Sequence, residues 1–102
     1  MATADTNTIE ETEVEQEAYI PKLYKVVLHN DNKTTFDFVI AVLCVVFHKT
    51  NDDALEITMN VHTKGKGVAG VYTREVAEEK ALEATALAND SGFPLVITFE
   101  ED

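Results

Sequence analysis

The sequence predicts an α+β fold in which three helices pack with a three-stranded, mainly antiparallel sheet. Three short stretches rich in β-branched and aromatic residues alternate with three longer segments whose apolar residues recur at helical spacing. Their order is strand, helix, helix, strand, helix, strand, which suggests helices on one face of a small sheet. The length of 102 residues allows one domain with a core of modest size.

The first strand is predicted over Leu23–Leu28, and a polar turn at Asn30–Asn32 follows it. Thr34 and Asp37 then form a Thr-x-x-Asp pattern typical of a helix start. The apolar positions after it have the spacing of one helix face, and they are Phe36, Val39, Ile40, Leu43, Val46 and Phe47. Cys44 shares this stripe, which favours a core thiol over a nucleophile.

Thr50 begins a second helix, which we expect to carry Ala54, Ile57, Thr58 and Val61 inward and to end at His62. Glycines at 65 and 67 precede a second strand over Val68–Tyr72. Thr73 can cap a third helix from Arg74 to about Ser91, with Gly92 as its stop. Its predicted inner face consists of Val76, Ala77, Ala81, Ala84 and Ala88. The last strand is predicted over Leu95–Phe99.

The chain is acidic, with a formal net charge of -11 at pH 7, and six of its 19 acidic residues lie within residues 1–18, which hold no Lys or Arg. We expect residues 1–20 to form a disordered acidic extension and residues 21–102 to form the folded domain. The acidity and the missing basic stripe argue against nucleic acid as a partner. The single cysteine and the lack of a long apolar run favour a cytoplasmic protein without membrane contact, or a plastid stromal one if the chain is a processed form. We also expect a monomer.

No catalytic motif, phosphate-binding loop or metal-ligand spacing is present, so we expect neither an enzyme nor a cofactor. The residues alone indicate a small interaction module with a polar turn beside an apolar helix. Several simpler interpretations stay open at this point. Asn30 and Asp31 could form an Asx turn, His62 could be a surface residue at a helix end, and Phe36 could belong to the core.

Several separated motifs resemble the ClpS adaptor family over residues 22–100, in the family's order and spacing. They are Tyr24-Lys25-Val26-Val27-Leu28-x-Asn30-Asp31, Thr34-x-x-Asp37-Phe38-Val39, Val61-His62, Gly70-Val71-Tyr72-Thr73-x-Glu75-Val76-Ala77-Glu78-x-Lys80 and Phe93-Pro94-Leu95. The resemblance implies an adaptor that binds proteins through a free, bulky, apolar N-terminal residue (Leu, Phe, Tyr or Trp), the signal known as an N-degron. It also implies delivery of these proteins to the N-terminal domain of a ClpA- or ClpC-type AAA+ unfoldase.

The resemblance assigns roles to individual residues. It implies that Asn30, Asn32 and His62 bind the substrate α-amine and that Asp31 binds the peptide backbone behind the first residue. The implied side-chain pocket consists of Thr34, Phe36, Val39, Thr58, Val61 and Leu95. Glu75 and Lys80 would contact the unfoldase.

Four positions depart from the usual family pattern. Asn32 stands where Asp is usual, Thr35 where Pro is usual, and Phe36 and Thr58 where Met is frequent. We expect the loss of Pro to loosen the first helical turn and the other changes to alter residue preference. An alternative function is a domain of similar topology, like the ribosomal stalk protein's C-terminal domain, that docks on a partner without reading N-termini. A weak metal-binding module is a more distant alternative.

Overall fold

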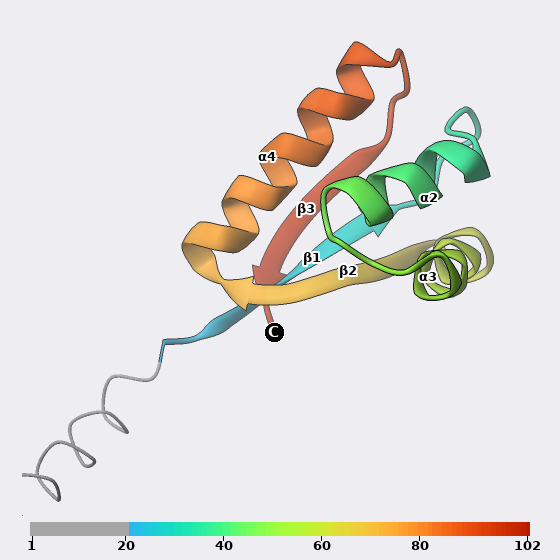
Figure 1. The fold of residues 1–102 in the computed structure, drawn as a ribbon. Coiled ribbons are helices and arrows are strands. Elements are labelled where there is room, and N and C mark those ends of the chain that lie inside the picture. Colours follow the sequence, from blue (N-terminus) through green and yellow to red (C-terminus); the bar gives the residue numbers. More distant parts are fainter. Residues whose placement is uncertain (1–20) are drawn as a thin grey trace, which may run out of the picture.

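The computed structural model describes residues 21–102, and its elements follow the predicted order (Figure 1). The bounds are β1 (Leu23–His29), α2 (Phe36–Val45), α3 (Asn51–Lys64), β2 (Lys66–Thr73), α4 (Arg74–Asp90) and β3 (Val96–Glu101). The strand order is β2-β1-β3, and both pairings are antiparallel. The predicted fold class is therefore confirmed. The acidic extension expected over residues 1–20 lies outside the described residues, so its predicted disorder stays a prediction.

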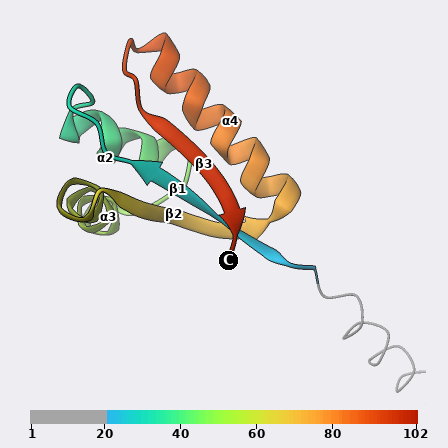
Figure 2. The same cartoon turned by 180° about the vertical axis from the view of Figure 1, so that it is seen from behind.

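The three helices cover one face of the sheet. Val26 and Leu28 point to this face from the central strand and are fully buried in the same cluster as the inner residues of all three helices. Alternate residues of β1, such as Lys25 and Val27, therefore point to the opposite face. In Figure 2 the strands lie in front of α2, and none of the described helices crosses over them.

The start of α2 corrects the predicted cap. The N-cap is Thr35, whose Oγ1 accepts a hydrogen bond from the amide of Phe38 at 3.2 Å, and not Thr34. Thr34 instead donates its hydroxyl to Asp31. Thr35 thus satisfies a free amide of the first turn, and the expectation that the lack of proline loosens this turn stays a prediction. The helix also ends at Val45, although Val46 and Phe47 beyond it are buried as predicted.

The end of α3 is determined by two glycines. Gly65 closes the helix with a φ of 89°, a left-handed conformation in which other residues are strained, and its amide donates to the carbonyl of Val61. Gly67 lies beneath the helix, where an added Cβ would stand 2.9 Å from Val61 Cγ2 and 3.1 Å from the carbonyl oxygen of Ile57. A side chain at Gly67 would thus push α3 away from β2.

Small side chains bring α4 close to the sheet. Four alanines at helical spacing (77, 81, 84 and 88) are buried, as predicted. Val76 was also predicted to face inward, but its side chain is 39% exposed, so this prediction is wrong. Thr73 occupies the N-cap position without a side-chain hydrogen bond, so the predicted capping by its hydroxyl is not found either.

The close packing of α4 can be tested with two alanines of the same helix. We expect Ala84→Leu to destabilise the domain by about 1–3 kcal/mol, because a fully buried site must accommodate three extra carbons. Ala86→Leu adds the same atoms at an exposed position and should change stability by less than about 0.5 kcal/mol. Urea unfolding of both variants measures the difference, and equal stabilities would contradict the packing described here.

Candidate functional site

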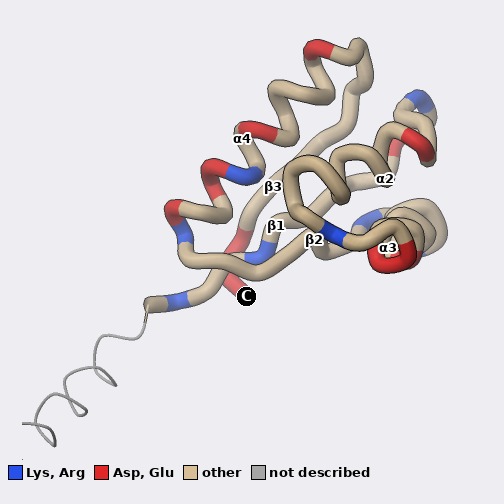
Figure 3. Tube along the Cα trace, in the orientation of Figure 1, with Lys and Arg blue, Asp and Glu red and all other residues tan. Residues whose placement is uncertain are grey.

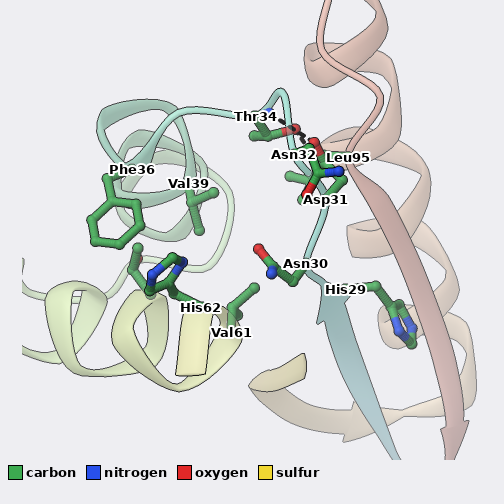
Figure 4. A pocket seen from close by; sticks show the side chains of 11 residues that line it. His29, Asn30, Asp31, Asn32, Thr34, Phe36, Val39, Val61, His62 and Leu95 are labelled. Carbon is green, nitrogen blue, oxygen red and sulfur yellow. Dashed lines mark hydrogen bonds between the residues drawn. The ribbon is translucent and has the colours of Figure 1, made fainter. Parts of the chain in front are cut away.

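One pocket of about 290 Å³ opens where the end of β1, the start of α2, the last turns of α3 and the start of β3 meet (Figure 4). All ten residues for which the sequence implied peptide contacts line it. They are Asn30, Asp31, Asn32, Thr34, Phe36, Val39, Thr58, Val61, His62 and Leu95. Residues separated by up to 65 positions in the chain thus gather around one cavity.

The loop after β1 is held in shape by the carboxylate of Asp31. Its Oδ1 accepts the amides of Lys33 at 2.8 Å and Thr34 at 2.7 Å, and its Oδ2 accepts the Thr34 hydroxyl at 2.7 Å. Partial burial raises the pKa of Asp31, but the three hydrogen bonds from Thr34 and Lys33 outweigh it and hold the pKa below its usual value. The Asx turn left open by the sequence is therefore present, and the side chain of Asp31 serves the loop.

Asn30 is anchored by its backbone and free at its side chain. Its amide donates to the carbonyl oxygen of Gly65 at 2.9 Å, which ties the end of β1 to the end of α3. Its side-chain amide points into the cavity, between the loop that carries Asn32 and the helix that carries His62 (Figure 4). An amide oxygen aimed into a cavity is available to accept a hydrogen bond from a ligand.

His62 and Phe36 form one side of the pocket entrance. Their ring centroids lie 5.0 Å apart with an interplanar angle of 72°, an edge-to-face arrangement. His62 is exposed on the last turn of α3, and Phe36 keeps 41% of its surface exposed on the first turn of α2. Phe36 is therefore a residue of the pocket entrance, and its assignment to the helix core is wrong.

The walls and floor are apolar. Val39, Val61 and Leu95 are at least 95% buried, and each belongs to the main core as well as to the pocket. Thr58 is buried beside them, and its hydroxyl donates to the carbonyl of Ala54 at 2.7 Å, so this donor is used within the helix. Leu95 precedes β3 in a loop that Phe93 holds against Phe38 of α2, at 4.6 Å between ring centroids.

The side chains of His29 and Cys44 do not face the pocket interior. His29 also lines the pocket, which sequence reasoning did not foresee, but its ring turns toward β3, where Nε2 lies 2.8 Å from Thr98 Oγ1 (Figure 4). Cys44 is half-buried outside the pocket, and its thiol donates to Asn51 Oδ1 at 3.5 Å. Within residues 21–102, no three His, Cys, Asp or Glu side chains gather as metal ligands. None of the helices in this part of the chain is long and apolar enough to cross a membrane.

The two residues expected to contact an unfoldase lie on α4, outside the pocket lining. Glu75 is exposed in the first turn. Lys80 is half-buried, and its Nζ donates to the carbonyl of Val46 at 2.8 Å, which fastens α4 to the end of α2. Lys80 therefore has a structural contact that the sequence did not reveal, although two of its three donors remain for other partners.

The pocket suits a ligand with a polar head and an apolar side chain. Amide and imidazole groups at the rim can accept hydrogen bonds, and the buried walls offer apolar surface to a side chain inserted between them. A small α+β domain with such a cavity is a recognition module.

Comparisons with known proteins identify the family. Residues 20–98 match the family model of ClpS, the ATP-dependent Clp protease adaptor protein. The chain is 49% identical to the Clp protease adapter protein ClpS of Myxococcus xanthus, over 96% of this chain and 92% of that protein. It is 53% identical to ClpS of Lawsonia intracellularis, over 79% of this chain and 74% of that protein. This protein therefore belongs to the ClpS family.

A solved structure has the same fold. Agrobacterium tumefaciens ClpS2, bound to L-phenylalaninamide, superposes with a TM-score of 0.79 at 44% identity. The match covers 81% of this chain and all of the ClpS2 chain. The resemblance inferred from the motifs is thus confirmed at the level of family and fold.

The role of Asp31 predicts a pH-dependent loss of stability. Because its pKa is lowered by folding, it stabilises the folded state above the pKa of the unfolded chain, and this contribution disappears as the pH falls through the folded-state pKa. Asp31→Asn keeps an acceptor for the amides but loses the one for the Thr34 hydroxyl. We expect it to cost about 1 kcal/mol at pH 7.

Urea unfolding of both proteins between pH 7 and pH 3 measures this effect. The difference between wild type and Asp31→Asn should stay constant down to about pH 5 and shrink below about pH 4. Glu83→Gln, an exposed carboxylate on α4, should leave stability nearly unchanged across the range. A difference that is independent of pH would show that the Asp31 charge does not hold the loop.

Proposed function

We propose that this protein binds other proteins through a free N-terminal residue with a bulky apolar side chain and delivers them to a Clp protease as a non-catalytic adaptor. One observation carries the proposal. The pocket of about 290 Å³ joins the loop after β1 to the last turn of α3, and its lining contains every residue that the family resemblance assigned to peptide binding. The ligand of the related ClpS2, L-phenylalaninamide, also combines a free α-amine with a bulky apolar side chain.

The α-amine would be read by Asn30, Asn32 and His62. An ammonium group has three hydrogens to donate, and two amide oxygens with one neutral imidazole nitrogen can accept them. Each hydrogen bond to a charged group contributes about 1.5–3 kcal/mol. Acetylation would remove both the charge and two donors, so it would leave these acceptors unpaired. Discrimination against blocked N-termini should therefore be steep.

The first side chain would enter the apolar part of the pocket, between Val39, Val61 and Leu95. Burying a Leu or Phe side chain there contributes about 1.5–3 kcal/mol. Phe36 stands at the entrance with its ring fixed against His62, which should make this entrance stiffer than one formed by a flexible side chain. Asp31 would hold the following peptide backbone through main-chain groups of its loop, since its carboxylate already accepts three internal hydrogen bonds.

Delivery would use a different surface. We propose that Glu75 and the free donors of Lys80 contact the N-terminal domain of a ClpA- or ClpC-type AAA+ unfoldase, with one adaptor copy acting as a monomer in the cytoplasm. Because neither residue lines the pocket, the adaptor could hold a substrate and its unfoldase at the same time.

Peptide binding is tested by fluorescence anisotropy with short labelled peptides that begin with Phe, Leu, Tyr, Trp, Ile or Met. We expect free bulky N-termini to bind with a Kd of about 1 µM, near -8 kcal/mol, and acetylated versions not to bind. Asn30→Ala and His62→Ala should each weaken binding at least about tenfold, the effect of losing about 1.4 kcal/mol.

Asn89→Ala, an exposed amide at the end of α4, is the matched control and should bind like wild type. Circular dichroism should show that all variants are folded. A folded wild-type protein that binds none of the peptides would favour the alternative function, a docking domain that does not read N-termini.

The docking surface is tested by charge reversal on α4. We expect Glu75→Lys to weaken binding to an isolated unfoldase N-terminal domain at least about fivefold while peptide affinity stays unchanged. Glu56→Lys makes the same charge change on the exposed side of α3 and should have little effect. Isothermal titration calorimetry measures both, and equal affinities of the two variants for the N-terminal domain would place the contact elsewhere.

A further inference from the structure

A second cavity lies where the sheet face opposite the core meets the last turns of α3. Its volume is about 320 Å³, and it shares no residue with the pocket described above. Its lining consists of Lys25, Val27, Asn60, Lys64, Lys66, Gly67, Val68 and Glu100. Val27 is 2% exposed and lies outside the main core cluster, so it is buried on the face of the sheet opposite the core, where Asn60 and Lys64 of α3 complete the cavity lining.

Positive charge gathers around this cavity in a chain that is otherwise acidic. Lys25, Lys64 and Lys66 are three of the eight basic residues of the whole protein, and Glu100 is the one acid in the lining. Among residues 21–102, the one ion pair joins Lys22 and Glu101, so these three ammonium groups remain without a carboxylate partner there. Figure 3 shows the contrast with α4, along which acidic positions recur.

The floor between these lysines is apolar. Val68 keeps 44% of its surface exposed on β2, next to the buried Val27 of the neighbouring strand, with which it is paired. A groove with an apolar floor and ammonium groups on its rim fits a peptide that combines carboxylates with apolar side chains.

Residues 1–20 of this chain have that composition. They hold six acidic residues, no Lys or Arg, and, apart from Met1, four large apolar residues, Ile9, Val14, Tyr19 and Ile20. Pro21 and Lys22 connect them to β1, and Leu23 at the start of this strand points to the same sheet face as Lys25 and Val27.

The groove is within reach of this segment. Six residue steps along β1 separate Leu23 from His29, which pairs with Lys66, a distance of about 20 Å. Ten extended residues span up to about 33 Å. The stretch from Glu10 to Glu17 can therefore turn back from Pro21 and lie over the lysines.

We propose that residues 9–17 dock in this second cavity, with their carboxylates on Lys25, Lys64 and Lys66 and their apolar side chains over Val27 and Val68. The docked segment lies on the sheet face away from the peptide pocket, so it leaves that pocket open. Because exposed charge pairs hold it, salt or a competing basic surface releases it. The proposal does not depend on what the first pocket binds.

Paramagnetic relaxation enhancement tests this in the full chain. A nitroxide is attached to Thr12→Cys in a Cys44→Ala background, and amide signal intensities are compared between the oxidised and reduced label. At about 50 mM NaCl we expect Val27 and Val68 to lose more than half of their intensity, while Leu82 on α4 keeps its own. At about 0.5 M NaCl the loss should vanish.

Two triple variants with the same change in net charge complete the test. Lys25→Gln/Lys64→Gln/Lys66→Gln should abolish the intensity loss, whereas Lys33→Gln/Lys49→Gln/Arg74→Gln should preserve it. Equal broadening over the whole surface, broadening confined to the first pocket, or equal behaviour of the two triples would overturn the proposal. So would broadening that persists when the nitroxide and the observed nuclei are on different molecules, since the occupant would then be a second copy.

Discussion

The hydrogen bond from the amide of Asn30 to the carbonyl of Gly65 joins the two chain segments on which the pocket depends. It can form because Gly65 adopts a left-handed conformation, which ends α3 and turns its carbonyl toward the end of β1. Gly67, two residues later, lets β2 pass so closely beneath α3 that Val61 lies over it. The wall formed by Val61, the position of His62 and the direction of Asn30 are therefore set by one junction of three elements. A change at either glycine would displace pocket residues without touching a ligand.

A second constraint operates at the opposite rim. The loop between β1 and α2 has few backbone hydrogen bonds to neighbouring elements, and Asp31 replaces them with three bonds of its own. Different side chains of residues 30–34 therefore stabilise the loop and face a ligand. The charged group holds the loop, and the neutral amides of Asn30 and Asn32 stay available to a ligand. Thr35 completes the arrangement, because its hydroxyl caps α2 directly after the loop and so determines where Phe36 stands.

The sequence predicted the fold and the lining of the first pocket for different reasons, and the binding roles of these lining residues stay predictions. Element order followed from periodicity, which burial enforces along the whole chain, as the alanine face of α4 illustrates. The pocket residues came from matched motifs, because nothing in a linear pattern says that Asn30 and His62 meet. What the sequence did not predict was either a choice between neighbouring residues or a contact between residues far apart in the chain. Thr34 and Thr35 compete for one cap, and the choice depends on Asp31, while the bond between Lys80 and Val46 spans 34 positions and leaves no signature in either segment.

The charge around the two cavities bears on how each would select its occupant. Asp31 is the one acidic residue that lines the first pocket, and its oxygens already accept hydrogen bonds from the loop. An α-amine bound there would therefore be recognised mainly through hydrogen-bond geometry, a short-range interaction that salt screens weakly. The second cavity is the reverse case, since its three lysines, of which Lys64 and Lys66 are exposed, attract over longer distances and lose this attraction in salt. The two sites could therefore be occupied independently, one by a chain end with the right shape and the other by a segment with the right charge.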